Sequence, residues 1–176
     1  MTTQHSRRDF LRGQPTRPSA PLMRPPGAQS GFSQLCNGCG ACARACPEAL
    51  IIRHEIRHEG PAGGSTPVVD FSKAACTFCG ACAAACETGA LRSEEVSNWP
   101  WRAVITDSCL SLNGISCRAC EDACAPRAIR FRLMTGGRAA PELDTAQCTG
   151  CAACAATCPA GAVAFERPAP VAEGSG

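Results

Sequence analysis

Bulky apolar and aromatic side chains are scarce in this chain. Its 176 residues include two tryptophans, six phenylalanines and no tyrosine, and cysteine and alanine inflate the 45% hydrophobic content. A large close-packed core of leucine, isoleucine, valine and phenylalanine is therefore excluded. No apolar run reaches the roughly 18 residues that a membrane-spanning helix needs. Something other than apolar burial has to hold the fold together.

Lysine is nearly absent as well. Lys73 is the single lysine, and the arginines beyond residue 30 are scattered singly among acidic residues. Residues 1–30 carry five arginines against Asp9, a net charge of +4, whereas the remainder of the chain carries a net charge of −2. This distribution excludes nucleic-acid binding as the main function.

Cysteine, in contrast, is abundant and regularly spaced. Three motifs have the spacing C-x2-C-x2-C-x3-C, and one has C-x7-C-x2-C-x3-C, which together use all 16 cysteines. In chain order the motifs are Cys36, Cys39, Cys42, Cys46; Cys76, Cys79, Cys82, Cys86; Cys109, Cys117, Cys120, Cys124; and Cys148, Cys151, Cys154, Cys158. This internal repeat is the dominant feature of the sequence.

The residues around the motifs repeat too. A short apolar stretch runs into an aspartate ahead of three motifs, and a turn followed by apolar residues comes after each fourth cysteine, as at 49–51 and 128–131. Each unit therefore predicts a short strand, a cysteine loop, one short helical turn and a second short strand. Cys36 and Cys76 are 40 residues apart and Cys109 and Cys148 are 39 apart, against 33 across the middle. The units thus group two by two.

The regular motifs resemble the signature of bacterial two-cluster ferredoxins, in which a proline follows the fourth cysteine and that cysteine ligates the neighbouring cluster. Pro47 and Pro159 fit this pattern, whereas Glu87 and Ala125 depart from it. The resemblance implies 4Fe–4S clusters, four in number or at least three, with the sixteen cysteines as ligands. The implied sets are Cys36, Cys39, Cys42, Cys86; Cys76, Cys79, Cys82, Cys46; Cys109, Cys117, Cys120, Cys158; and Cys148, Cys151, Cys154, Cys124.

The same resemblance implies an α+β fold made of tandem two-cluster bacterial-ferredoxin-like domains, with short strands, short helices and little regular secondary structure. We expect a flexible basic tail at residues 1–31, domains with two clusters each at 32–97 and 98–167, and a disordered C-terminal tail at 168–176. The boundary between the domains is expected at residues 97–100, where Pro100 excludes a regular helix.

Three alternatives compete for the cysteines. Eight disulfides would suit a cysteine-rich chain, but C-x2-C pairs have poor disulfide geometry. Zinc ribbons use two separated C-x2-C pairs instead of a run of three. In the third motif the loop between Cys109 and Cys117 could deliver a fourth ligand, or the site could hold a three-cysteine cluster.

Other candidate functional residues are few. His54 and His58 could form a metal pair, although solvated residues between strands explain them more simply. Trp99 and Trp101 fit packing between the halves better than docking of a partner. No phosphate-binding loop, Ser-His-Asp set or spare thiol is present, so we expect no enzyme.

The N-terminal segment carries a further signature. Ser6-Arg7-Arg8-Asp9-Phe10-Leu11-Arg12 resembles the twin-arginine export motif, but the next eighteen residues hold only Leu22 and Met23 as bulky apolar side chains. An export signal needs an apolar region at this point. The motif is thus present without the part that enters a membrane, and a chance basic tail is the alternative.

Three features point to one family: this N-terminal start, the cysteine motifs and the stretch from Cys117 to Phe131. Over about residues 6–165 the chain resembles the NapF family, the ferredoxin-type accessory proteins of the periplasmic nitrate reductase system. The resemblance implies a cytoplasmic iron–sulfur protein that contacts the catalytic subunit precursor of that reductase and helps its maturation before export. An electron-transfer polyferredoxin in an anaerobic respiratory or oxidoreductase system is the main alternative, and a cluster-bearing scaffold or redox sensor is a third.

Overall fold

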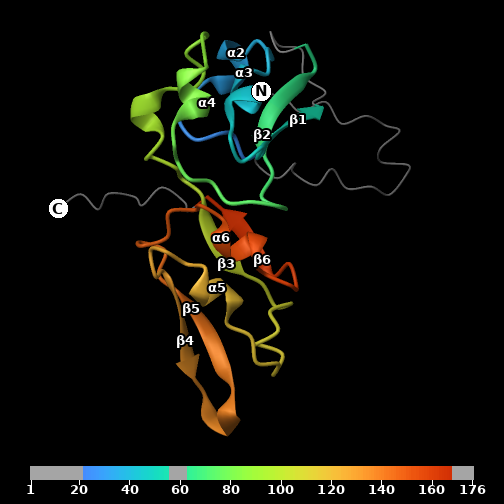
Figure 1. Ribbon diagram of the computed structural model, residues 1–176, viewed down its shortest axis with the longest axis vertical. Helices are drawn as coiled ribbons and strands as arrows, with labels where there is room; N and C mark the ends of the chain where they lie inside the picture. The colour runs from blue at the N-terminus through green and yellow to red at the C-terminus, as the bar shows by residue number, and fades with distance from the viewer. Residues whose placement is uncertain (1–21, 56–62, 168–176) are drawn as a thin grey trace, which may run out of the picture.

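The computed structural model describes residues 22–55 and 63–167, so the twin-arginine-like motif, His58 and the C-terminal tail lie outside the described residues. The chain forms two halves stacked along its long axis (Figure 1). The first half contains α2 (Phe32–Leu35), α3 (Ala41–Ala45), β1 (Ile51–Glu55), β2 (Ser65–Val69), α4 (Ala81–Ala84) and the 3₁₀ turn η1 (Ser93–Glu95). The second contains β3 (Arg102–Ile105), α5 (Ala119–Asp122), β4 (Ile129–Leu133), η2 (Thr135–Gly137), β5 (Ala139–Leu143), α6 (Ala153–Ala156) and β6 (Val163–Glu166).

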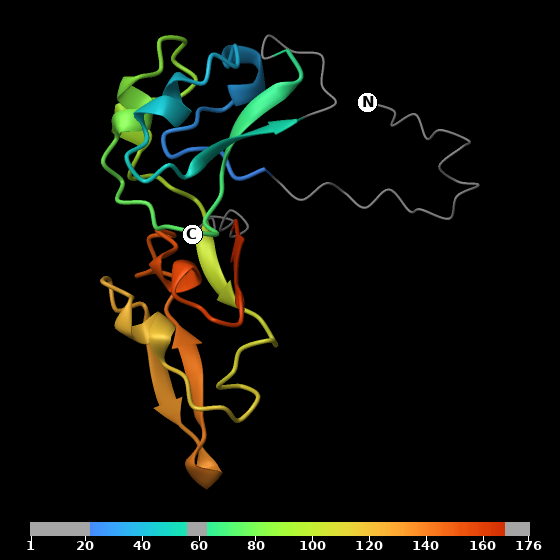
Figure 2. The same cartoon turned by 45° about the vertical axis from the view of Figure 1, so that its right-hand side comes forward.

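The two halves share one plan. In each, an antiparallel hairpin lies between the two cysteine motifs: β1 pairs with β2 from Ile51↔Val69, and β4 pairs with β5 from Ile129↔Leu143. The ends of the second half also pair, with Arg102↔Glu166 in β3 and β6. The corresponding ends of the first half make a single bridge, Ala28↔Leu91. The second hairpin extends away from the body and ends in η2 (Figure 2).

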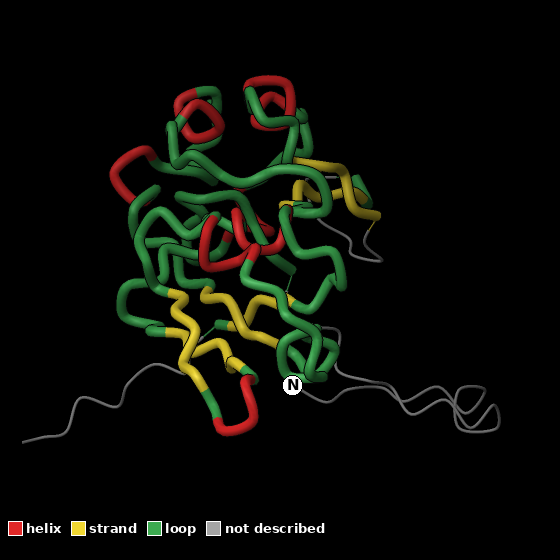
Figure 3. The backbone as a smooth tube through the Cα atoms, turned by 60° about the horizontal axis from the view of Figure 1, so that its bottom comes forward, coloured by secondary structure: helices red, strands yellow, loops and turns green. Residues whose placement is uncertain are grey.

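The predicted fold class is confirmed. The apolar stretches before the second, third and fourth motifs form β2, β3 and β5, and those after the first, third and fourth motifs form β1, β4 and β6. The stretch at Ala90 and Leu91 forms only the bridge to Ala28 instead of a strand. Loops make up most of the described backbone (Figure 3), as expected for a chain with little regular secondary structure.

Four of the helices have the same role. The helices α3, α4, α5 and α6 each have four or five residues and carry the third cysteine of one motif. Helices this short are not stable in isolation. Their geometry therefore depends on packing and on whatever the cysteines bind.

The core is divided into three small clusters. The first is centred on Phe32, Ile51 and Leu91, and the third on Ala103 and Ile129. The second lies between the halves, where Trp99 and Trp101 pack with Leu50, Phe71 and Ala152. This contact confirms the prediction that the tryptophans pack between the halves. Cysteine side chains are part of or packed against all three clusters, as the scarcity of bulky apolar residues requires.

Residues 22–31 differ from the expectation of a flexible tail, because they pack on the first half. The Val69 N–H donates to Met23 O at 2.8 Å, and the Gln29 N–H donates to Ala90 O at 3.0 Å. Pro25 is fully buried, and the Arg24 guanidinium lies 4.9 Å above the Phe32 ring. Extended, proline-rich backbone can add to a sheet edge without helical periodicity, so the sequence pattern did not reveal this contact. In the described parts of the chain, no helix has the length and apolarity that a membrane crossing requires.

We expect Gly27→Ala to destabilise this N-terminal segment. Gly27 has φ +88°, and an added Cβ would lie 2.5 Å from Arg92 O. The left-handed backbone and the collision together should cost about 2 kcal/mol, lowering the Tm of the anaerobic holoprotein by roughly 4–8 °C. Gly89→Ala is the matched control, because Gly89 has φ +72° and no atom within 4 Å of the added Cβ. Equal losses in Tm for the two variants would contradict the packing at Gly27.

Candidate metal centres

The structure brings the cysteines together in the four sets that the ferredoxin resemblance implies, which we name sites 1 to 4. Site 1 comprises Cys36, Cys39, Cys42 and Cys86; site 2, Cys46, Cys76, Cys79 and Cys82; site 3, Cys124, Cys148, Cys151 and Cys154; and site 4, Cys109, Cys117, Cys120 and Cys158. Each set takes three cysteines from one motif and one from the paired motif.

Site 1 is identified by the cysteines that neighbour Cys42, a buried residue of α3. Burial raises the pKa of this thiol, and the negative charges of Cys36, Cys39 and Cys86 add to the rise. Cys86 comes from the second motif. Its own pKa is lowered: burial opposes the lowering, but hydrogen bonds from Thr88 and from the Leu91 N–H favour the thiolate and outweigh it.

Site 2 surrounds an apolar cavity. The four cysteines of the set line it, together with Leu50, Ile51 and Val69 among other residues. Burial raises the pKa of Cys82 to about 11, and Cys76, Cys46 and Cys42 contribute further. Cys42 belongs to site 1, so its effect on the pKa of Cys82 indicates that sites 1 and 2 lie close together.

Site 3 has the same construction in the second half. Cys124, Cys148, Cys151 and Cys154 line a cavity whose walls include Ala103, Ile129 and Phe165. Burial raises the pKa of Cys154 to about 12, with added contributions from Cys151, Cys148, Cys124 and Cys120. Cys120 belongs to site 4, so sites 3 and 4 also lie close together.

Site 4 includes the irregular motif. Burial raises the pKa of Cys120 to about 11, and its charged neighbours are Cys109, Cys117 and Cys158. The structure thus brings Cys109 to this site despite its longer separation from Cys117. Cys109 is thus a candidate fourth ligand at this site.

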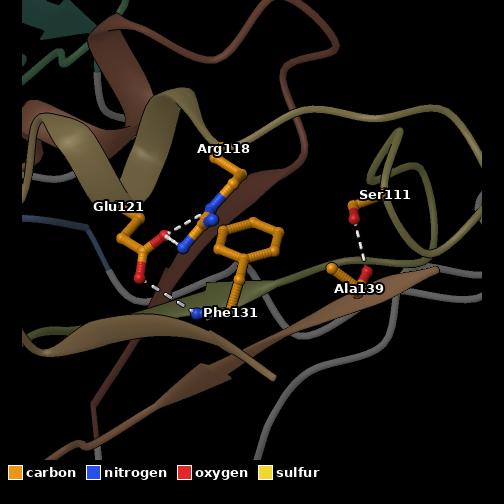
Figure 4. A network of polar contacts seen from close by, with 5 residues as sticks. All are labelled: Ser111, Arg118, Glu121, Phe131 and Ala139. Atoms are coloured by element: carbon orange, nitrogen blue, oxygen red, sulfur yellow. Dashed lines mark hydrogen bonds and ion pairs between the residues drawn. The ribbon is translucent and has the colours of Figure 1, made fainter. Parts of the chain in front are cut away.

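Polar contacts hold the irregular loop in place. The Asn113 side chain donates to Asp107 O at 2.7 Å and to Cys109 O at 2.9 Å. The Ser111 hydroxyl donates to Ala139 O on β5, which ties the loop to the second hairpin (Figure 4). These bonds hold residues 107–113, which include the buried Cys109, against the second hairpin.

A second network fixes α5 against the hairpin. Arg118 Nε donates to Glu121 Oε2 at 2.7 Å, and the Phe131 N–H donates to Glu121 Oε1 at 3.2 Å (Figure 4). The hydrogen bond from Arg118 is the main cause that lowers the pKa of Glu121. The Arg118 guanidinium also lies 5.7 Å from the centre of the Phe131 ring. Glu121 therefore accepts hydrogen bonds from Arg118 at the start of α5 and from Phe131 in β4. These bonds hold α5, the helix that carries Cys120, against the hairpin.

One backbone N–H donates to a cysteine sulfur in every site. The donors are Leu91 to Cys86 (3.4 Å), Phe78 to Cys76 (3.4 Å), Ala103 to Cys148 (3.5 Å) and Ala162 to Cys158 (3.3 Å). Such bonds favour the thiolate, which is the form that binds metal. In iron–sulfur proteins they also raise or lower the reduction potential.

The sites suit iron–sulfur clusters by their donor chemistry. Each offers four thiols, and one thiolate at each iron is the ligation of a 4Fe–4S cluster. Within the described ranges, no three His, Cys, Asp or Glu side chains are close enough to share a single metal ion. His54 lies exposed on β1.

A buried donor without a partner is also consistent with bound sulfur. Trp99 Nε1 has no hydrogen-bond partner in the described residues. This nitrogen lies against Gly150 in the loop between Cys148 and Cys151. Buried donors are normally paired, and cluster and thiolate sulfurs accept such bonds. The roles of Trp99 and Thr88 beside the cysteines could not be predicted from the motifs, because neither residue belongs to one.

Two cysteine motifs on either side of an antiparallel hairpin, repeated in each half, are typical of a ferredoxin-type iron–sulfur protein. A family model described as a 4Fe-4S dicluster domain matches residues 35–90 and 115–162. Ferredoxin-type protein NapF of Escherichia coli strain K12 is 36% identical over 168 residues, 94% of this chain and 97% of that protein. The chain belongs to the family of ferredoxin-type proteins that includes NapF, and it binds several 4Fe–4S clusters.

Two further relatives support the assignment. NapF of Haemophilus influenzae is 39% identical over 143 residues, 80% of this chain and 77% of that protein. Methylamine utilization ferredoxin-type protein MauM of Methylorubrum extorquens is 35% identical over 159 residues, 83% of this chain and 72% of that protein. These names describe ferredoxin-type proteins and do not name an enzyme.

Proposed function

We propose that the sixteen cysteines ligate four 4Fe–4S clusters in sites 1 to 4, two in each of two domains that meet near residues 97–100. The observations that support the ligand sets are the two four-cysteine cavities and the charged neighbours of Cys42 and Cys120. With all thiols assigned to clusters and no other catalytic constellation in the sequence, the protein acts as a non-enzymatic iron–sulfur protein.

The proposed role is to assist maturation of the catalytic subunit of periplasmic nitrate reductase in the cytoplasm, before export. The observation that carries this proposal is the 36% identity to NapF across nearly the full length of both chains. The partner is the precursor form of that subunit.

Binding and metallation test the role together. We expect the anaerobic holoprotein, used as bait, to retain the nitrate reductase precursor more strongly than the mature enzyme. A strain that lacks this protein should export a reductase with reduced iron content. The variant Cys36→Ala/Cys39→Ala, which removes two ligands of site 1, shows whether the clusters are needed. Absence of precursor binding together with a fully metallated reductase in the deletion strain would contradict the proposal.

Electron transfer is the second candidate function. It is favoured by the similarity to MauM and by the proximity of successive sites, shown by the pairs Cys82–Cys42 and Cys154–Cys120. A deletion strain that exports fully metallated reductase but loses electron flow to it would favour this function over maturation.

A further inference from the structure

The ligand loops of site 2 and site 3 touch each other across the two halves. The Cys76 N–H donates to Cys151 O at 2.8 Å, although the two residues belong to different halves. No strand or helix therefore separates these two sites.

An aromatic junction surrounds this contact. Phe78 and Trp99 meet edge to face with ring centres 6.3 Å apart, and Phe71 meets Phe165 at 5.2 Å. Gly150 approaches so closely that an added Cβ would collide with Trp101 O and would lie 2.6 Å from the Trp99 ring. We call the packing of these residues with Leu50, Trp101 and Ala152 the junction.

Two residues of the junction hold an unfavourable backbone conformation. Phe78 has φ 53° and Ala152 has φ 69°. The position of Phe78 in its motif corresponds to Gly38 and Gly150, and that of Ala152 corresponds to Gly40 and Gly80. A left-handed backbone conformation is unfavourable for a non-glycine residue and persists where the surrounding packing over-determines it. Here the Phe78 ring packs on Trp99, and the fully buried Ala152 packs in the same core.

We propose that the junction makes sites 2 and 3 electron-exchange neighbours, so that the four sites form a single row from site 1 to site 4 instead of two independent pairs. Within each half the sites already adjoin, because α3 packs against α4 and α5 packs against α6, and these helices carry one cysteine of each site. A bound 4Fe–4S cluster supplies one-electron chemistry. In an exchange across Cys76 and Cys151 one site gives up an electron and the other gains it, with no bond or proton transferred.

Magnetic interaction between the reduced sites tests the row on the full-length chain. One variant keeps only sites 2 and 3 by replacing two ligands of each outer site with alanine: Cys36, Cys39, Cys109 and Cys117. Its matched control keeps sites 2 and 4 through the same number of replacements: Cys36, Cys39, Cys148 and Cys151. We expect about eight irons in each variant, and spin–spin broadening in the EPR spectrum of the reduced protein only where sites 2 and 3 remain.

The outcomes separate the row from the ligand assignment on which it rests. About eight irons with unbroadened spectra in both variants would overturn the row but would agree with the proposed ligand sets. Equal broadening in both would overturn it as well, because sites 2 and 4 are not adjacent in the row. Iron contents that do not follow the removed sites would instead contradict the ligand sets.

A second pair of variants tests the junction with all sixteen cysteines present. Gly150→Ala inserts a methyl group against Trp99 and Trp101, whereas Gly80→Ala has a similar φ, +76° against +74°, and no atom within 4 Å of its Cβ. We expect weaker spin–spin broadening per bound iron in Gly150→Ala than in Gly80→Ala. Identical spectra would show that the junction does not set the interaction.

Discussion

Replacing Cys36 and Cys86 together with alanine is expected to remove one cluster, about four of sixteen irons. Both residues belong to site 1, where Cys86 and Cys36 are charged neighbours of Cys42. Replacing Cys76 and Cys86 instead removes one ligand from each of sites 1 and 2 and should damage two clusters. Anaerobic iron analysis and EPR of the reduced proteins measure the difference.

The contrast between these two double variants is diagnostic for exchanged ligands. If each motif held its own cluster, Cys76 and Cys86 would share a site, and the order of the losses would reverse. The equivalent pair in the second half, Cys109 with Cys158 against Cys148 with Cys158, provides an independent repeat. A reversed order in either half would contradict the proposed sets for that half.

Removing the iron is expected to unfold the described fold cooperatively. The clusters of buried residues are small, and thiols such as Cys42 and Cys154 are part of them. Helices of four or five residues cannot persist without tertiary support. Because the unfolded chain has no preformed sites, the free energy of cluster binding is also free energy of folding.

Circular dichroism and limited proteolysis under anaerobic conditions measure this effect. We expect iron chelation to abolish the strand signal and to open both hairpins to protease, and we expect iron and sulfide to restore them. If the chain stays protease-resistant after all iron is removed, apolar burial alone holds the fold and the prediction is wrong.

The motif spacing was sufficient to predict much of the molecule. Apolar stretches before three of the motifs and after all four predict strands, and all but the stretch at Ala90–Leu91 form them. The distances between Cys36, Cys76, Cys109 and Cys148 predict which motifs pair, whereas the exchange of the fourth cysteine comes from the resemblance to two-cluster ferredoxins. Spacing works here because a cysteine loop is a local structure of few residues with little conformational freedom.

The long-range contacts could not be predicted from the motif spacing. The bond from Cys76 to Cys151 and the packing of residues 22–31 depend on how the halves and edges meet, which local patterns do not encode. Trp99 and Trp101 indicated a contact between the halves but not which loops it joins. The left-handed Phe78 and Ala152 stand where glycine would be expected, and only the surrounding packing explains them.

Counting iron and acid-labile sulfide in the anaerobically purified protein tests the central claim most directly, namely that sixteen cysteines form four cluster sites. We expect about sixteen irons and sixteen sulfides per chain, with EPR signals of 4Fe–4S clusters on reduction. About twelve irons or fewer in the fully reconstituted protein would contradict it.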